Sequence, residues 1–307
     1  MRHAVLLAAV AATLCAVLCA AAPAALAQNN RTFVSGKGMD TNPCSATAPC
    51  RGFAQALSVT NAGGEITVLD SAGYGPVTIT KAVTITAIGV EAAITATTTD
   101  GIDINAGASD VVTLRGLTLT QTGNTGANRN GIAFSSGGTL NIQNCVVRGF
   151  SNDGIHLAPT NAATVNVSDT IVSTSGSGGF TVVFPTGAVT AFFERVQALG
   201  NLNGFFFASN GPAITATVAN SAASGNIGGL FVSGSGISTA MVVNSQIYEN
   251  SAGLEAGGNG TLIIANSKIN GNGSEGFKDF STIKTFGNNY FANNGSNNGS
   301  LTPIAQQ

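Results

Sequence analysis

Residues 204–232 read GFFFASNGPAITATVANSAASGNIGGLFV, and they contain one full copy of a repeat followed by the start of the next. Gly204 precedes an apolar residue, a variable residue and a second apolar residue, and Gly229 begins the same pattern 25 residues later. In the middle of the copy, Ala216 and Val218 alternate with threonines. Such alternation is typical of short β-strands that bury one face.

The pattern continues in both directions from this stretch, with copies that are 23 to 30 residues apart. They begin at Gly101, Gly131, Gly154, Gly179, Gly204, Gly229, Gly253 and, more weakly, Gly276. Two further apolar pairs recur at similar distances after each glycine, so one repeat contains about three strands. A unit of about 24 residues cannot cover its own apolar face, but coils stacked about 4.8 Å apart bury a continuous core. We therefore predict an all-β fold, a parallel β-helix of about 8–10 coils.

Two series of polar residues accompany the apolar columns. The first follows the second strand of each repeat and comprises Asn144, Asp169, Arg195, Asn220, Asn244, Asn266 and Asn288. Asn and Asp tolerate the left-handed backbone of tight turns, so we expect this series to form turns, with Asp169 and Arg195 paired across adjacent coils. The second series lies before the glycines and is interpreted in the same way: Asn152, Asn201, Asn226, Asn250 and Asn272.

Composition excludes several classes of protein. Only 8% of the residues are charged, the net charge is −2, and 44% are hydrophobic. A disordered chain would be poor in apolar residues, so a packed core is expected. No basic stripe is available to neutralise phosphates, and nucleic acid is therefore not an expected partner.

The first residues have the pattern of an export leader. An apolar run from Ala4 to Ala22 is followed by Ala25-Leu26-Ala27, a small-residue pattern that signal peptidase accepts. We predict a signal peptide at 1–27 and a secreted, periplasmic or cell-surface location. The alternative is an uncleaved anchor, because the run is just long enough to span a bilayer. No other stretch is long enough, so no transmembrane span is expected in the mature chain.

The next segment is predicted to cap the stack. Cys44 and Cys50 are expected to form a disulfide in an oxidising compartment, whereas Cys145 falls in an apolar column and is expected to be a buried thiol. Residues 50–60 read CRGFAQALSVT, and the helical spacing of their apolar residues predicts an amphipathic helix over the first coil. The predicted divisions are a cap at 28–62, the β-helix at 63–292 and a flexible tail at 293–307.

The cap also resembles a known family. The runs that carry the resemblance are Thr32-Phe33-Val34-Ser35, Gly38-Met39-Asp40, Asn42-Pro43, Pro49-Cys50-Arg51 and Ala54 to Leu57. They look like the N-terminal cap of bacterial right-handed parallel β-helix proteins of the pectin-lyase-like superfamily. The coil pattern extends the resemblance over nearly the whole mature chain and implies the right-handed form of the fold. Activity stays open, because this superfamily includes polysaccharide lyases, glycoside hydrolases, esterases and adhesins.

Two segments, each at the start of a predicted strand, carry candidate catalytic residues. Residues 99–104 (TDGIDI), with Asp100 and Asp103, resemble the acidic segment of polygalacturonases, whose carboxyl groups protonate the leaving oxygen and activate water. Asp153 and His156 follow two coils later, and alternation places Asp103 and His156 on one outer face, roughly 10 Å apart. The polygalacturonase pattern is incomplete, because Ala133 stands in the intervening coil and the Gly-His-Gly and Arg-Ile-Lys segments are missing. A purely turn-forming role for Asp-Gly is the competing interpretation.

A lyase would need a base and usually a calcium site. Arg129, Arg148 and Asp153 are the residues expected near His156 in that case. The sequence has no dense acidic cluster, so no cofactor is expected, and Ca²⁺ is expected only if the protein is a lyase.

The remaining members of the same outer row suggest binding. The row reads Asp103, Ala133, His156, Thr181, Phe206, Phe231, Glu255 and Lys278. Phe206 and Phe231 fall in adjacent coils, and exposed aromatic rings suit a sugar ring or another protein; a loop or a second copy of the chain could instead cover them. We favour an exported protein that binds a polysaccharide, a surface glycan or an extracellular partner. The alternatives are a polysaccharide lyase or glycoside hydrolase acting on acidic polysaccharide, and a structural or adhesive rod.

Overall fold

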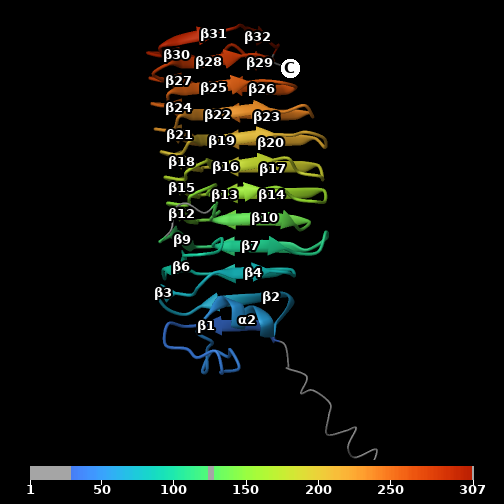
Figure 1. Cartoon of the computed structure of the whole chain (residues 1–307), viewed down its shortest axis with the longest axis vertical. Coiled ribbons are helices and arrows are strands. Elements are labelled where there is room, and N and C mark those ends of the chain that lie inside the picture. Colours follow the sequence, from blue (N-terminus) through green and yellow to red (C-terminus); the bar gives the residue numbers. More distant parts are fainter. Residues whose placement is uncertain (1–28, 124–127, 306–307) are drawn as a thin grey trace, which may run out of the picture.

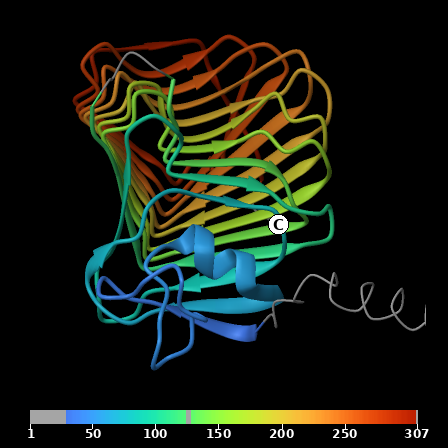
Figure 2. The same ribbon diagram turned by 60° about the horizontal axis from the view of Figure 1, so that its bottom comes forward.

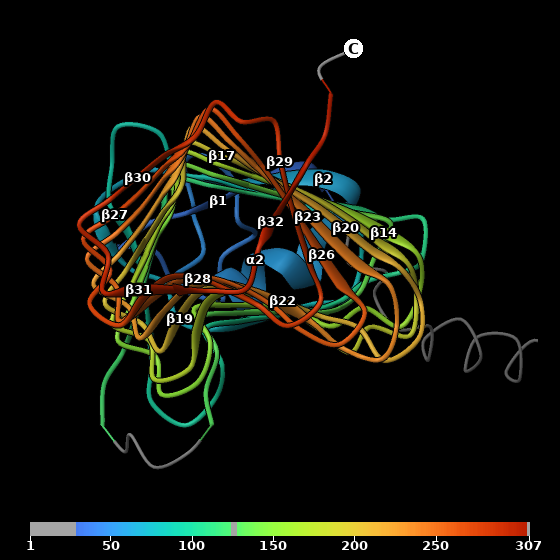
Figure 3. The same cartoon turned by 90° about the horizontal axis from the view of Figure 1, so that it is seen from above.

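The chain is wound into a stack of about nine coils, and each coil contributes strands to three long sheets (Figure 1). The computed structural model describes residues 29–123 and 128–305, so the predicted leader at 1–27 lies outside the described residues. Neighbouring strands pair in parallel. Seen along the stack, the three sheets form the sides of a ring (Figure 3).

Sheet A has 12 strands: β1 (Asn29–Val34), β2 (Thr60–Val68), β5 (Val83–Thr86), β8 (Val111–Arg115), β11 (Thr139–Gln143), β14 (Ala163–Ser168), β17 (Val189–Glu194), β20 (Ile214–Ala219), β23 (Ser238–Val243), β26 (Gly260–Ala265), β29 (Thr282–Thr285) and β32 (Leu301–Pro303). Sheet B has 10: β3 (Ala72–Gly73), β6 (Ala92–Ala96), β9 (Leu117–Gln121), β12 (Val146–Arg148), β15 (Ile171–Ser173), β18 (Gln197–Leu199), β21 (Ala222–Ser224), β24 (Gln246–Tyr248), β27 (Lys268–Asn270) and β30 (Tyr290–Ala292). Sheet C has 10: β4 (Val77–Ile79), β7 (Ile102–Asn105), β10 (Ile132–Ser136), β13 (Ile155–Leu157), β16 (Gly178–Val183), β19 (Asn203–Ala208), β22 (Gly228–Ser233), β25 (Ala252–Ala256), β28 (Glu275–Asp279) and β31 (Ser296–Asn298).

The three sets of alternating apolar residues are the inner faces of these sheets, as predicted. Ile142 on β11 stands opposite Val167 on β14, and both are buried. The inner residues of all three sheets form one continuous core. In the middle coils the core contains phenylalanines, such as Phe180 and Phe205, whose ring centroids lie 5.1 Å apart in a stacked arrangement. Burial of these large side chains is the main stabilising contribution, at roughly 1.5–3 kcal/mol each.

The turns between sheets A and B confirm six of the seven members of the first polar series; in the coil of Asn288, the left-handed residue is instead Gly287, with a φ of 78°. Its members Asn144, Asp169, Arg195, Asn220, Asn244 and Asn266 have φ values between 47° and 52°. This left-handed conformation is least costly for Asn, Asp and Gly, which explains the composition of the series. Asp169 and Arg195 form the expected pair, with Nε of Arg195 2.7 Å from the Asp169 carboxylate.

The second polar series forms a buried ladder of amides, with one exception. Asn201, Asn226, Asn250 and Asn272 are almost completely buried. Each donates a hydrogen bond from Nδ2 to Oδ1 of the asparagine in the next coil, and the ladder ends on Asn294. The repeat predicts that Asn152 belongs to this series, but Asn152 donates to Asn130 Oδ1 at 2.9 Å instead. The ladder asparagines each follow a strand of sheet B by two residues, as Asn201 follows Leu199, whereas Asn152 is four residues past the end of β12 and Phe150 takes the corresponding position.

At the N-terminal end of the stack, helix α2 (Phe53–Val59) lies beside the first strands (Figure 2). It buries Phe53, Ala56 and Leu57, as an amphipathic helix does. The helix is shorter than the predicted segment 50–60, because Gly52 and Thr60 have extended backbones. Its role as a cap stays a prediction.

The predicted disulfide between Cys44 and Cys50 is confirmed, and Cys145 is a buried free thiol, as expected. Burial raises the pKa of Cys145 to about 11. Within the described residues, no helix has the length and apolar character needed to cross a bilayer. The β-helix continues past residue 292, because β31 and β32 lie inside the segment predicted as a tail and pair with β28 and β29. The flexibility of that segment stays a prediction.

Candidate functional site

One row of side chains runs along the outer face of sheet C, and it is the row predicted from the sequence. The strand registers place its members in consecutive coils: Asp103, Ala133, His156, Thr181, Phe206, Phe231, Glu255 and Lys278. All eight are buried or half-buried, so neighbouring groups cover part of each side chain. Coils are about 4.8 Å apart, so the row extends for about 34 Å along the stack.

The middle of the row is aromatic. Phe206 on β19 and Phe231 on β22 stack with their ring centroids 5.3 Å apart and an interplanar angle of 17°. Their strands place them in register, and both side chains are half-buried. The two rings together form a flat apolar surface two coils wide on a row that is otherwise polar apart from Ala133. Flat apolar surfaces of this kind suit the apolar face of a sugar ring or of another aromatic group.

On the N-terminal side of the aromatic pair, Asp153 and His156 form a hydrogen-bonded dyad. His156 Nδ1 lies 2.7 Å from Oδ2 of Asp153. Asp153 is nearly completely buried, and its Oδ1 accepts a hydrogen bond from the backbone N–H of Gly178 at 2.6 Å. A Cβ at residue 178 would lie 2.0 Å from Oγ1 of Thr181, so a larger residue there would require Thr181 to change its rotamer. The fixed carboxylate holds the imidazole in one orientation, which leaves Nε2 for exchange of a proton with a ligand.

Asn130 connects this dyad to the two carboxyl groups of the coil two steps before. Its backbone N–H and its Nδ2 donate to the carboxylate of Asp100, at 2.9 Å and 3.1 Å. Its Oδ1 accepts a hydrogen bond from the backbone N–H of Asp153. Asp100, in turn, shares a hydrogen bond with Asp103. The structure thus gathers Asp100, Asp103, Asp153 and His156 in one network. No sequence pattern signals the bridging role of Asn130, which lies at the end of the longest repeat.

The electrostatics of Asp103 favour its protonated form. Burial raises the pKa of this carboxyl group above its usual value, and the nearby charge of Asp100 raises it further. The hydrogen bond with Asp100 acts in the same direction, whereas the positive charge of Arg129 opposes it. A carboxylic acid that keeps its proton can serve as a proton donor. A hollow of about 340 Å³ adjoins Asp103, and its walls are Ala54, Leu57, Pro76, Val77, Thr78 and Thr99.

The two arginines predicted near His156 have different positions. Arg129 lies close enough to Asp103 to influence its pKa. In the part of the chain that the structure describes, Nε of Arg129 and Oγ1 of Thr181 are buried without a hydrogen-bond partner. Such groups are uncommon in folded proteins and are often found at functional sites. Arg148 is on β12 in sheet B, exposed, and it pairs in register with Thr120 and Ser173, whereas His156 is on β13 in sheet C, so the two residues lie on different sheets.

The residues present do not fit a metal ion. Among residues 29–123 and 128–305, no three side chains of His, Cys, Asp or Glu gather closely enough to hold one. The predicted calcium ion of a lyase would need several oxygen ligands. No chemical step is therefore assigned to a metal at this site.

A third exposed or half-buried aromatic residue, next to sheet C, is not anticipated by the repeat. Phe184 directly follows β16, is 55% exposed, and has a φ of 47°. A left-handed backbone is rare for a bulky residue and costs on the order of 1–3 kcal/mol. Strain of this size is most often found near functional sites, and the sequence carries no signal for it.

We expect Asp103→Asn to stabilise the protein at neutral pH. The unfolded aspartate titrates near pH 3.9, and the folded pKa is raised. The contribution of Asp103 to stability is therefore fully present below about pH 3.9 and is lost as the pH rises through the folded pKa. Asparagine does not ionise, so urea unfolding should give the variant a higher midpoint than the wild type at pH 7. The difference should shrink as the pH falls toward 4; a difference that does not change with pH would contradict the assignment.

Comparisons with known proteins agree with this architecture. A scan against protein-family models finds no match, and no curated protein matches either. The crystal structure of the pectate lyase Pel9A is similar over 90% of this chain and 78% of that chain, with a TM-score of 0.63 and 15% identity. The lacto-N-biosidase of Eubacterium ramulus, a GH136 enzyme, has a TM-score of 0.45 and 9% identity, and covers 90% of this chain and 68% of its own. The A-module of the mannuronan C-5 epimerase AlgE4 of Azotobacter vinelandii has a TM-score of 0.41 and 16% identity, over 80% of this chain and 89% of the module.

At this level of sequence identity, the likeness to Pel9A concerns the fold and not the activity. It agrees with the three parallel sheets and the stacked coils. It also bears out the resemblance noted in the sequence of the cap and the coils. The chain therefore has the fold of a right-handed parallel β-helix.

Proposed function

We propose that this protein binds a polysaccharide along the outer face of sheet C, outside the cytoplasm. The observation that carries the proposal is the stacked pair Phe206 and Phe231 in the middle of the row. The apolar face of a sugar ring can pack against these rings, while its hydroxyl groups hydrogen-bond to polar side chains on either side. Glu255 and Lys278 continue the row beyond Phe231.

The geometry of the row favours a polymer over a small ligand. The row runs parallel to the axis of the stack, so a linear chain can contact successive coils in the same way. A ligand that spans the row gains contacts from several coils at once, and its affinity should therefore increase with chain length. The likeness of the fold to that of the pectate lyase Pel9A supports a polysaccharide as the class of ligand.

The disulfide supports a location outside the cytoplasm. Structural disulfides form and persist in oxidising compartments and are rare in the cytosol. The Cys44–Cys50 bond is therefore consistent with a secreted, periplasmic or cell-surface protein.

A second candidate function is cleavage of an acidic polysaccharide, as a glycoside hydrolase or a lyase. The specific observation that favours it is the network of Asp100, Asp103, Asp153 and His156. In this account Asp103 donates a proton to the leaving oxygen, and His156, oriented by Asp153, accepts one. His156 lies two coils before Phe206 on the same outer row, so a polymer that spans these coils could contact both.

Incubation with a panel of neutral and acidic polysaccharides distinguishes these functions. Binding is measured by retention in affinity gels, and cleavage by ultraviolet absorbance of unsaturated products and by new reducing ends. We expect retention without cleavage, unchanged in His156→Ala. Cleavage that Asp103→Ala or His156→Ala abolishes would establish the enzyme instead. Neither retention nor cleavage would favour the structural or adhesive rod.

A further inference from the structure

The corner between sheets A and B lies across the ring from the outer face of sheet C (Figure 3). Its turns carry the left-handed polar series, whose side chains project along the outside of the stack. In the C-terminal coils these amides bond to one another, as when Nδ2 of Asn266 donates to Oδ1 of Asn244 at 2.7 Å. If every amide of this corner series were bonded to its neighbour in this way, the series would have little hydrogen-bonding capacity left for a ligand.

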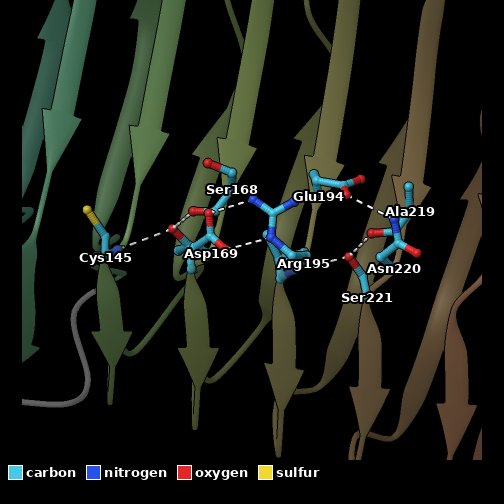
Figure 4. A network of polar contacts seen from close by, with 10 residues as sticks. Cys145, Ser168, Asp169, Glu194, Arg195, Ala219, Asn220 and Ser221 are labelled. Carbon is cyan, nitrogen blue, oxygen red and sulfur yellow. Dashed lines mark hydrogen bonds and ion pairs between the residues drawn. The ribbon is translucent and has the colours of Figure 1, made fainter.

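This corner series is interrupted in the middle of the stack by charged residues (Figure 4). Arg195 donates to both oxygens of Asp169, at 2.7 Å and 2.8 Å, and to Oε1 of Glu194 at 3.0 Å. Asn220 donates its Nδ2 to the same Oε1 at 2.9 Å. Asn220 is thereby bonded to the coil before it, whereas Asn244 is bonded to the coil after it.

The interruption leaves one amide acceptor and one amide donor without partners. Within the described residues, no hydrogen bond joins Asn220 to Asn244, and neither Oδ1 of Asn220 nor Nδ2 of Asn244 has another partner. Both residues are exposed and line the same hollow. A ligand hydroxyl between them can accept from one amide and donate to the other.

The hollow itself comes from short side chains in one coil. In the outer row of sheet B, Ala222 stands between Gln197 and Gln246 in register. In the next outer column, Ser224 stands next to Tyr248. The resulting hollow has a volume of about 340 Å³, and its floor is Ala222. The two glutamines that flank it are about 9.6 Å apart along the stack, which leaves space for one ring between their amides.

The charges that line the hollow select against an anion. Among the lining residues the one positive charge is that of Arg195, and it is already shared by two carboxylates, Asp169 and Glu194. Lys268 stands one coil beyond Gln246, outside the residues that line the hollow. The hydrogen bond from Arg195 keeps the pKa of Asp169 below its usual value, so that carboxylate is ionised at neutral pH. A uronate or sulfate group would therefore meet a local excess of negative charge. Uncharged hydroxyl groups meet amides, which both donate and accept.

We propose that this corner is a second binding site, which takes one unit of a neutral sugar between Gln197 and Gln246. The hydroxyl groups of the sugar complete the broken hydrogen-bond series between Asn220 and Asn244. Tyr248 lines the hollow on the side of sheet B. The site is separate from the proposed polysaccharide site on sheet C, so the protein could contact two glycan chains at once.

The test uses saturation-transfer NMR with cellotetraose, mannotetraose and xylotetraose as neutral probes and tetragalacturonate as the acidic probe. All proteins carry Phe206→Ala and Phe231→Ala, which remove the aromatic pair of sheet C from the measurement. Ala222→Leu fills the hollow without changing a strand hydrogen bond. Asn244→Gly removes the amide and tolerates the left-handed backbone. Thr118→Leu is the matched control, because Thr118 lies in the same column of sheet B four coils away.

We expect at least one neutral tetraose to bind, with an affinity at least tenfold lower in both Ala222→Leu and Asn244→Gly and unchanged in Thr118→Leu. Tetragalacturonate should bind at least tenfold more weakly than that neutral probe. The proposal is overturned if no neutral tetraose binds, if filling the hollow leaves binding unchanged, or if the acidic probe binds equally well. Since the aromatic pair is absent from every variant, these outcomes do not depend on the site on sheet C.

Discussion

Replacing Phe206 and Phe231 together with alanine should lower the affinity for a retained polysaccharide at least about 30-fold, which corresponds to about 2 kcal/mol. The two rings form one stacked surface in the middle of the row on sheet C. Each aromatic ring that packs against a ligand ring contributes about 1 kcal/mol or more. The single variants should each lose part of this affinity. Binding is measured by affinity electrophoresis over a range of polysaccharide concentrations.

The matched control for this prediction is Phe192→Ala. Phe192 lies on β17 in sheet A, where its side chain is 46% exposed, so the substitution removes an exposed ring of the same type from a different face. It should leave affinity unchanged. Equal losses from Phe192→Ala and from the double variant would mean that binding depends on overall surface hydrophobicity and not on the row.

Asn226→Ala should lower the free energy of unfolding by about 3 kcal/mol or more. It leaves several buried polar groups without hydrogen-bond partners, at a cost of about 1–3 kcal/mol each. Oδ1 of Asn226 accepts hydrogen bonds from the backbone N–H and from Nδ2 of Asn201. Its Nδ2 donates to the carbonyl oxygen of Ala198 at 3.0 Å and to Oδ1 of Asn250. Water cannot replace these bonds readily, because Asn226 is only 3% exposed.

Guanidinium unfolding, followed by circular dichroism, measures this effect as a shift in midpoint. Asn166→Ala provides the control, because Asn166 also stacks on an asparagine, with Nδ2 donating to Oδ1 of Asn141 at 2.9 Å, but lies half-buried on the outer face of sheet A. Its loss should cost less than about 1 kcal/mol, since water can satisfy the freed groups. Similar midpoints for the two variants would argue against a stabilising ladder.

The architecture could be predicted from the sequence because two periods agree. Alternation with period 2 assigns each strand residue to the inner or the outer face, and the repeat length assigns it to a coil. Together they predict that Asp103, Ala133 and His156 stand in register on one outer face, and the strand pairing confirms it. The same two periods locate the left-handed turns, where Asn and Asp recur.

Features that depend on the turns between the strands could not be predicted in this way. The predictions for Asn152 and Arg148 differ from the structure for different reasons. Asn152 lies four residues after the end of β12, whereas the ladder asparagines lie two residues after the strands of sheet B, so counting back from the glycine assigns it to the wrong column. Arg148 directly follows the apolar position Val147, so the repeat itself is sufficient to assign it to sheet B. The link from Asp100 through Asn130 to Asp153 depends on side-chain conformations in the longest repeat, for which period and spacing give no information.

The most direct test of the proposed function is hydroxyl-radical footprinting of the protein with the polysaccharide that retains it most strongly. If the polymer lies along the outer face of sheet C, oxidation of Phe206 and Phe231 should fall together when the polysaccharide is present, while oxidation of Phe192 on sheet A should not change. Binding that leaves Phe206 and Phe231 as reactive as in the free protein would place the ligand elsewhere and contradict the account. The absence of any retaining polysaccharide would contradict it as well.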